Sequence, residues 1–124
     1  MSEQPNMPTV VWAEIAVTDL EKSRAFYGAV LERELQIIDG GVNHMVPLSD
    51  MDDPQTSAHL YPGTPSRDGN VIHILAPGKL EATMDRVVAA GGKVESDPIP
   101  VPVGRFFYAR DLDDNCIGFF EAAA

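Results

Sequence analysis

Cysteine, basic residues and long apolar runs are all scarce in this sequence. The single cysteine, Cys116, excludes an intramolecular disulfide. Nine Lys and Arg against 19 Asp and Glu give a formal net charge of −10, which repels nucleic-acid phosphates and anionic lipid surfaces. No apolar run approaches the roughly 18 residues that cross a bilayer, and the polar opening "MSEQPNMPT" lacks the layout of a secretory signal. We therefore expect a cytoplasmic protein with neither a nucleic-acid nor a membrane partner.

The common catalytic motifs are also missing. The sequence has no G-x-S-x-G, H-E-x-x-H or C-x-x-C, and "AAGGKV" lacks the spacing and the Ser or Thr of a phosphate loop. Its 124 residues are 44% hydrophobic and 23% charged, which is typical of one soluble globular unit. We expect a single domain over residues 1–124.

A strand, a helix and three further strands are predicted twice along the chain. Alternation in "VVWAEIAV" indicates a strand, and "TDLEKSRAFYGAVLE" a helix that opens with a Thr18/Glu21 capping box. Short strands are expected in "ELQIID", "NHMVPLS" and "SAHLYP". The second half repeats the order as "NVIHILAP", the helical "LEATMDRVVAAGG", the edge strand "GKVESDPIPV", "RFFYAR" and "CIGFFE". The patterns predict an α+β fold of two βαβββ modules, residues 9–62 and 70–122.

Glu14 is a carboxylate inside the first predicted strand. The alternation places it on the face opposite Ala13 and Ile15. Laying the first strand of each half over the other pairs Glu14 with His73, which also has apolar neighbours in the opposite row. The polar rows of both strands should therefore face away from the helices.

The chain resembles the vicinal oxygen chelate superfamily, which holds glyoxalase I, bleomycin-resistance proteins and extradiol dioxygenases. The resemblance covers roughly Val10 to Glu121 and rests on "EIAVTDLEKSRAFYGAVL", "LEATMDRVVAAGGKV" and "GRFFYARDLDDNCIGFFE". Within the family the chain looks most like the small, uncharacterised glyoxalase-like proteins of bacteria. The resemblance implies two curved mixed sheets around a cavity for a divalent metal and a substrate, and a homodimer. It also implies that Glu14 and His73 look into one shared cavity.

The family's metal ligands do not carry over to this sequence. By resemblance the four ligand positions fall at Trp12, Val71, Gly118 and His59, of which only the histidine can donate an electron pair from its side chain. A catalytic divalent ion ordinarily takes three protein ligands. We therefore expect no metal and no other cofactor. A displaced site of Glu14, His73 and His59 would offer a recognised set of two His and one carboxylate, but two of its members lie about 7 Å along their strands from the family positions.

The polar residues of these strands are also compatible with purely structural roles. Glu14 can be solvated at a rim or paired with Arg105 or Arg110, and the two histidines can be hydrogen-bonded cavity or core residues.

Aromatic residues supply candidate walls for a ligand. Trp12 stands in the place of a metal ligand, and Phe120 shares the cavity-facing row of the last strand with Gly118. The candidate binding residues are Trp12, His59, Tyr61, Phe107 and Phe120.

Two functions follow from this site. The first is a metal-free protein that binds a small organic molecule between its modules. The second is an enzyme of lyase, isomerase or dioxygenase type, in which Glu14 is a proton-transfer base and His73 or His59 stabilises developing charge. The missing ligand set favours the binding protein.

Overall fold

The chain folds into two modules, each with a strand, a helix and then further strands. The computed structural model describes residues 12–39, 44–49 and 58–124. The first module comprises β1 (Ala13–Val17), α1 (Leu20–Leu31), β2 (Ile38–Asp39), β3 (His44–Pro47) and β4 (Ala58–Pro62). The second comprises β5 (Ile72–Leu75), α2 (Leu80–Ala89), β6 (Lys93–Val94), β7 (Ile99–Val101), β8 (Gly104–Arg110) and β9 (Cys116–Ala122). The predicted α+β fold of paired βαβββ modules is confirmed.

Each module forms its own mixed sheet. The strand orders are β1-β4-β3-β2 and β5-β9-β8-β6, and in each sheet the first and last strands of the module are parallel neighbours. The proline-interrupted edge segment is divided into β6 and β7, which pair with opposite ends of β8. Pro98 lies between these two strands, where it interrupts no ladder. Among the described residues, β1 and β5 stand at the ends of their strand orders.

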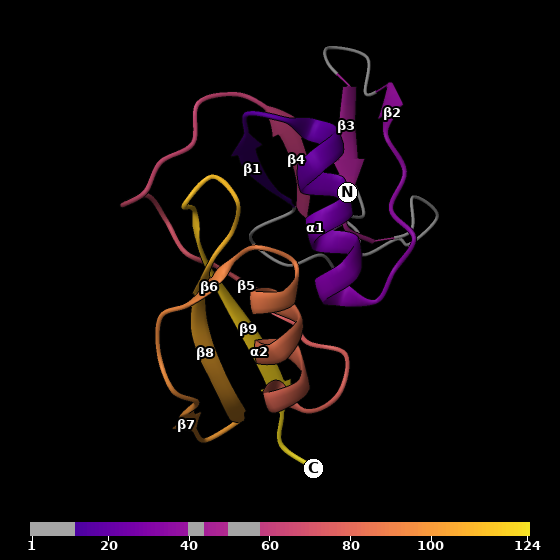
Figure 1. The fold of residues 1–124 in the computed structure, drawn as a ribbon. Helices are drawn as coiled ribbons and strands as arrows, with labels where there is room; N and C mark the ends of the chain where they lie inside the picture. The colour runs from indigo at the N-terminus through magenta and orange to yellow at the C-terminus, as the bar shows by residue number, and fades with distance from the viewer. Residues whose placement is uncertain (1–11, 40–43, 50–57) are drawn as a thin grey trace, which may run out of the picture.

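The two helices cover one face of each sheet. Figure 1 shows α1 beside β3 and β4, α2 beside β8 and β9, and the helices next to each other. Alternate strand residues point into this layer and form one core with the helices, including Ile15, Val17, Val46, Leu60, Phe107, Ala109, Ile117 and Phe119. The opposite face of each sheet, which we call its open face, is covered by neither of these two helices. In the described part of the chain, neither helix has the length and apolar character of a membrane span.

Helix α1 begins one residue later than the predicted capping box. Asp19 is its N-cap, and its carboxylate accepts a hydrogen bond from the backbone N–H of Lys22 at 3.0 Å. Thr18 instead donates its backbone N–H and its hydroxyl to Asp113, in the turn between β8 and β9. The expected Thr18/Glu21 box is therefore wrong, although the helix itself is confirmed.

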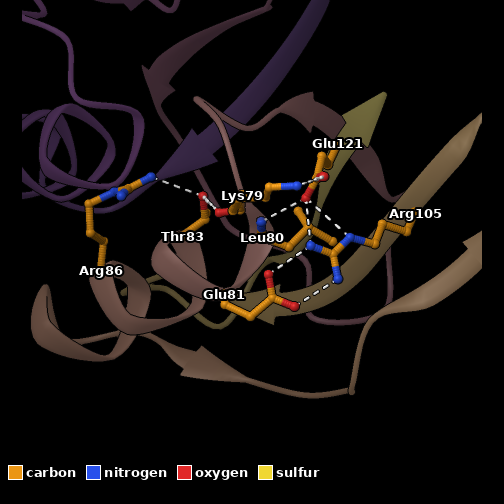
Figure 2. Close-up of polar contacts among 7 residues, drawn as sticks. All are labelled: Lys79, Leu80, Glu81, Thr83, Arg86, Arg105 and Glu121. Carbon is orange, nitrogen blue, oxygen red and sulfur yellow. Dashed lines mark hydrogen bonds and ion pairs between the residues drawn. The ribbon is translucent and has the colours of Figure 1, made fainter. Parts of the chain in front are cut away.

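Helix α2 is capped by a carboxylate from another element. Its N-cap, Lys79, makes no side-chain cap bond, and the Glu121 carboxylate at the end of β9 instead accepts the Leu80 N–H at 2.9 Å. Arg105 on β8 holds Glu121 with bonds of 2.8 and 3.1 Å and binds both oxygens of Glu81 at 2.7 Å (Figure 2). This network ties the first turn of α2 to strands β8 and β9.

The same network predicts a loss of stability in acid. Chiefly through its hydrogen bonds, Arg105 lowers the pKa of Glu81 from 4.5 to about 2. A folded-state pKa below the unfolded one stabilises the protein above about pH 4.5, and this contribution is lost as the pH falls toward 2. We expect Glu81→Gln to lower the urea midpoint at neutral pH. The urea midpoints of the variant and the parent protein should become equal as the pH falls from 4.5 toward 2. Glu34→Gln, which changes an exposed glutamate without an ion pair among the described residues, is the control. A difference in urea midpoint between Glu81→Gln and the parent protein that stays constant over this pH range would contradict the prediction.

The turn between β8 and β9 joins the second module to the first. The Asp111 carboxylate, 6% exposed, accepts the Tyr27 hydroxyl of α1 at 2.7 Å and the backbone N–H groups of Asp113 and Asn115. The Asn115 amide also donates to Asp111 and to the carbonyl oxygen of Ala16 on β1. Burial, followed by the adjacent Asp111 charge, raises the pKa of Tyr27 well above its ordinary value. A buried polar cluster therefore fixes how the modules meet.

Candidate functional site

Glu14 and His59 form a pair on the open face of the first sheet. The parallel register of β1 and β4 sets the two residues opposite each other, with His59 Nε2 3.0 Å from Glu14 Oε2. The histidine side chain is 17% exposed and the glutamate 56% exposed. The two arginines that the sequence offered as partners are engaged elsewhere, Arg105 with Glu81 and Glu121 and Arg110 with Glu95. A carboxylate on one ring nitrogen fixes the imidazole tautomer and allows a proton to be shared.

Tyr61 lies on the same open face. It follows His59 by two positions on β4, so both side chains point away from α1. Its ring lies against Gly63, where an added Cβ would come within 2.7 Å of Tyr61 Cε2. Tyr61 therefore shares the open face with the Glu14–His59 pair, and its ring lies on the Gly63 side.

His73 occupies a different setting, on the open face of the second sheet. Its register partner on β9 is Gly118, where an added Cβ would lie only 2.2 Å from His73 Nδ1. The imidazole therefore lies over the glycine backbone. Phe106 and Tyr108 of β8 meet it edge to face, with ring centroids 4.9 and 5.9 Å away. An aromatic cluster thus holds the histidine.

Phe107 was predicted as a ligand wall, and the structure places it elsewhere. It is fully buried on the helix side of β8 and packs against Phe119, with ring centroids 5.5 Å apart. Phe120 is on the open face as expected, and its cross-strand partner is Phe106. Of the two phenylalanines in "RFFYAR", Phe106 and not Phe107 lies on the open face.

A crevice of about 430 Å³ lies between the two modules. Its lining comes from the start of β1, the end of α1, the chain around β3 and β4, and β5 with the residues after it. Trp12, 57% exposed, and His73 both line it, so the structure brings these two predicted site residues together. Glu14 is not among the described lining residues. We expected Glu14 and His73 to face one shared cavity. The structure instead places them in two separate environments, because each side chain contacts a residue of its own sheet, Glu14 with His59 and His73 with Gly118.

The donor set does not fit the metal that the fold family implies. Trp12 and Val71 are exposed apolar residues at two ligand positions, and the third, Gly118, is covered by the His73 ring. The displaced triad is not assembled either, because His73 lies among aromatic rings while His59 binds Glu14. Within the described residues, no three His, Cys, Asp or Glu side chains are grouped as a metal site.

The position of the His73 imidazole over Gly118 predicts what happens when a methyl group is added to that glycine. We expect Gly118→Ala to push the imidazole off the sheet and to lower the free energy of unfolding by about 1 kcal/mol, because the ring contacts of His73 are lost. Because the ring would leave Phe106 and Tyr108, the ring-current shifts of its protons in NMR spectra should disappear. In a His73→Ala background the same substitution should cost much less, since the clash is gone. If the losses in free energy of unfolding of the two substitutions simply add in this double-mutant cycle, the His73 ring does not lie over Gly118.

Comparison with known families identifies the fold. Residues 9–119 match the family model described as the Glyoxalase/Bleomycin resistance protein/Dioxygenase superfamily. The chain belongs to this superfamily. The match covers nearly all of both modules and confirms the predicted resemblance. No curated protein sequence matches the chain.

Several solved structures share the architecture at low sequence identity. A hypothetical protein, SA1046 from S. aureus, is 23% identical with a TM-score of 0.62, over 94% of this chain and 100% of that one. A glyoxalase/bleomycin resistance protein from Albidiferax ferrireducens is 19% identical with a TM-score of 0.68, over the same shares. The fosfomycin resistance protein FosX from Listeria monocytogenes is 16% identical with a TM-score of 0.65, over 94% and 95%. At these identities the likeness shows the fold alone.

Proposed function

We propose that this protein binds a small organic molecule in the crevice between its modules, without the metal usual in its superfamily. The observation that carries the proposal is the meeting of Trp12 and His73 at a crevice of about 430 Å³. That volume is within the range of small-molecule sites, which are mostly apolar with a few fixed polar groups. Trp12 supplies a flat apolar wall, and the imidazole of His73 supplies a hydrogen-bonding group held in place by its aromatic neighbours.

A second copy of the chain completes this proposal. The open faces carry large apolar side chains that no helix covers, among them Trp12, Val71 and Leu75, which are 57%, 39% and 67% exposed. A homodimer that lays the open face of one copy on that of another would bury these side chains and enclose the crevice. Sedimentation at several concentrations would test the dimer.

An enzyme is the second candidate function, and the Glu14–His59 contact favours it. A carboxylate 3.0 Å from an imidazole is a geometry suited to proton transfer, with Glu14 as the base and His59 as its partner. Such a pair would serve a lyase, isomerase or dioxygenase-type reaction on a small oxygenated substrate. If compounds that bind are also turned over, Glu14→Gln should abolish turnover and retain binding.

Ligand screening tests the proposed function directly. Trp12 is the sole tryptophan, so its fluorescence reports on the crevice without labelling. We expect members of a fragment library to change that fluorescence and raise the melting temperature. Trp12→Ala should weaken binding, measured calorimetrically, about ten-fold. Val103→Ala removes an exposed apolar side chain outside the crevice and is the matched control. Stoichiometric divalent metal after purification without chelator would overturn the metal-free proposal.

A further inference from the structure

Arg33 is the one charged side chain, other than the titratable His73, among the described residues that line the crevice. It follows the end of α1, where Glu32 adopts a left-handed conformation and the Arg33 N–H donates to the carbonyl oxygen of Gly28 at 3.0 Å. Its guanidinium Nη1 donates to the carbonyl oxygen of Leu48, also at 3.0 Å. Both ends of the residue are therefore anchored, and the cation is held at the crevice.

The ion pairs of the described residues distinguish Arg33 from the other arginines. The other five each pair with a carboxylate: Arg24 with Glu21, Arg67 with Asp114, Arg86 with Glu32, Arg105 with Glu81, and Arg110 with Glu95. In the same described part of the chain, Arg33 has only the Leu48 carbonyl oxygen as its side-chain acceptor. That bond uses one of the five N–H donors of a guanidinium. The described residues leave the other donors of Arg33 without an acceptor, and an anchored cation of this kind is suited to an anion.

The rest of the crevice is also compatible with an anion. Its described lining contains no carboxylate, although the chain carries 19 Asp and Glu. Ser49 and His73 add two further side chains that can donate hydrogen bonds, and apolar groups such as Trp12, Ile72 and Leu75 form most of the remaining surface. Such a lining suits a ligand that combines a compact negative group with an apolar body.

We infer that the ligand is a small organic monocarboxylate that binds Arg33 through its carboxylate and places its apolar body against Trp12. This inference rests on the proposed function and gives that ligand a chemical class. A planar guanidinium matches a carboxylate in a two-bond geometry. A doubly charged phosphate would leave one negative charge uncompensated beside a single cation, in a protein with a formal charge of −10.

Matched ligands test the inference. The probes are phenylacetate, phenylacetamide and phenethylamine, which share a ring and differ in charge, followed by the same trio with larger and aliphatic bodies. Binding is measured by Trp12 fluorescence and by calorimetry. We expect the acids to bind at least about ten-fold more tightly than the amides, and the amines to bind least.

Variants then locate the charge. Arg33→Gln should remove the preference for acids over amides, and Arg33→Lys should restore part of it. Lys22→Gln makes the same change in net charge on the exposed side of α1, away from the crevice, and should leave the preference intact. Because Arg33 is exposed, the Gln variant should remain folded, which circular dichroism would check.

The possible failures are distinguishable. Tight binding of amides or amines that Trp12→Ala weakens would overturn the carboxylate inference and leave the proposed function standing. A preference for acids that Arg33→Gln does not alter, or that Lys22→Gln lowers equally, would also overturn the inference. Failure of every acid, amide and amine to bind would overturn the proposed function and the inference together.

Discussion

Asp111→Ala should lower the free energy of unfolding by about 3–5 kcal/mol, which is a large share of the stability of a domain of this size. The carboxylate is 6% exposed and accepts hydrogen bonds from Tyr27, Asp113 and Asn115. Its removal leaves the buried Tyr27 hydroxyl and the buried backbone N–H of Asn115 without their acceptor, and an unsatisfied buried polar group costs more than an average hydrogen bond contributes. Urea denaturation followed by circular dichroism measures the loss.

Two further variants separate the parts of this cluster. Tyr27→Phe removes one donor and leaves Asp111 its three bonds to Asp113 and Asn115, so we expect a smaller cost of about 1–2 kcal/mol. Asp85→Ala on the exposed side of α2 removes an equal charge without touching the cluster and should be nearly neutral. A loss for Asp111→Ala no larger than that of Asp85→Ala would show that the cluster does not hold the modules together.

The cluster also bears on the proposed site. Tyr27 belongs to the first module and Asp111 to the second, while the Asn115 amide contacts the backbone of β1 at Ala16. The crevice is lined by β1 on one side and β5 on the other, so its shape depends on how the two modules are held. Variants of Asp111 that remain folded should therefore bind crevice ligands more weakly, although Asp111 itself lies outside the lining.

Sequence periodicity could predict the modules and the faces of their strands. Alternation placed Glu14 and His73 in the rows that face away from the helices, and both residues lie there. The overlay of the two halves also identified them as equivalent positions. Two residues at equivalent positions of a repeat need not touch each other, however, because their contacts depend on which strands pair. The registers show that Glu14 faces His59 as His73 faces Gly118, so each first-strand residue meets the last strand of its own module.

Arg33 could not be predicted as a site residue for a related reason. It lies in the irregular segment between α1 and β2, where no periodicity assigns a face to a side chain. Its place at the crevice follows from three tertiary facts: α1 ends at Leu31, β3 brings the Leu48 carbonyl oxygen alongside, and β5 approaches from the other module. A sequence that marks the end of a helix does not reveal what lies beside that end.

The two neighbouring phenylalanines of β8 give the sharpest contrast between core and site. Phe107 is fully buried against Phe119, so Phe107→Ala should lower the free energy of unfolding by about 3–5 kcal/mol. Phe106 is half-buried on the open face beside His73 and Phe120, so Phe106→Ala should cost less, about 1–2 kcal/mol.

Ligand binding should respond in the opposite order. Phe106→Ala removes an edge contact that holds His73 at the crevice, and we expect the affinity of a crevice ligand to fall several-fold in a protein that remains folded. Phe107→Ala should leave the affinity of the fraction that remains folded nearly unchanged, because its ring lies on the helix side of the sheet. Urea denaturation and calorimetry on the same two variants measure both quantities. A stable Phe107→Ala protein with weakened binding would instead support the ligand wall that the sequence suggested, and would contradict the strand face assigned to it by the structure.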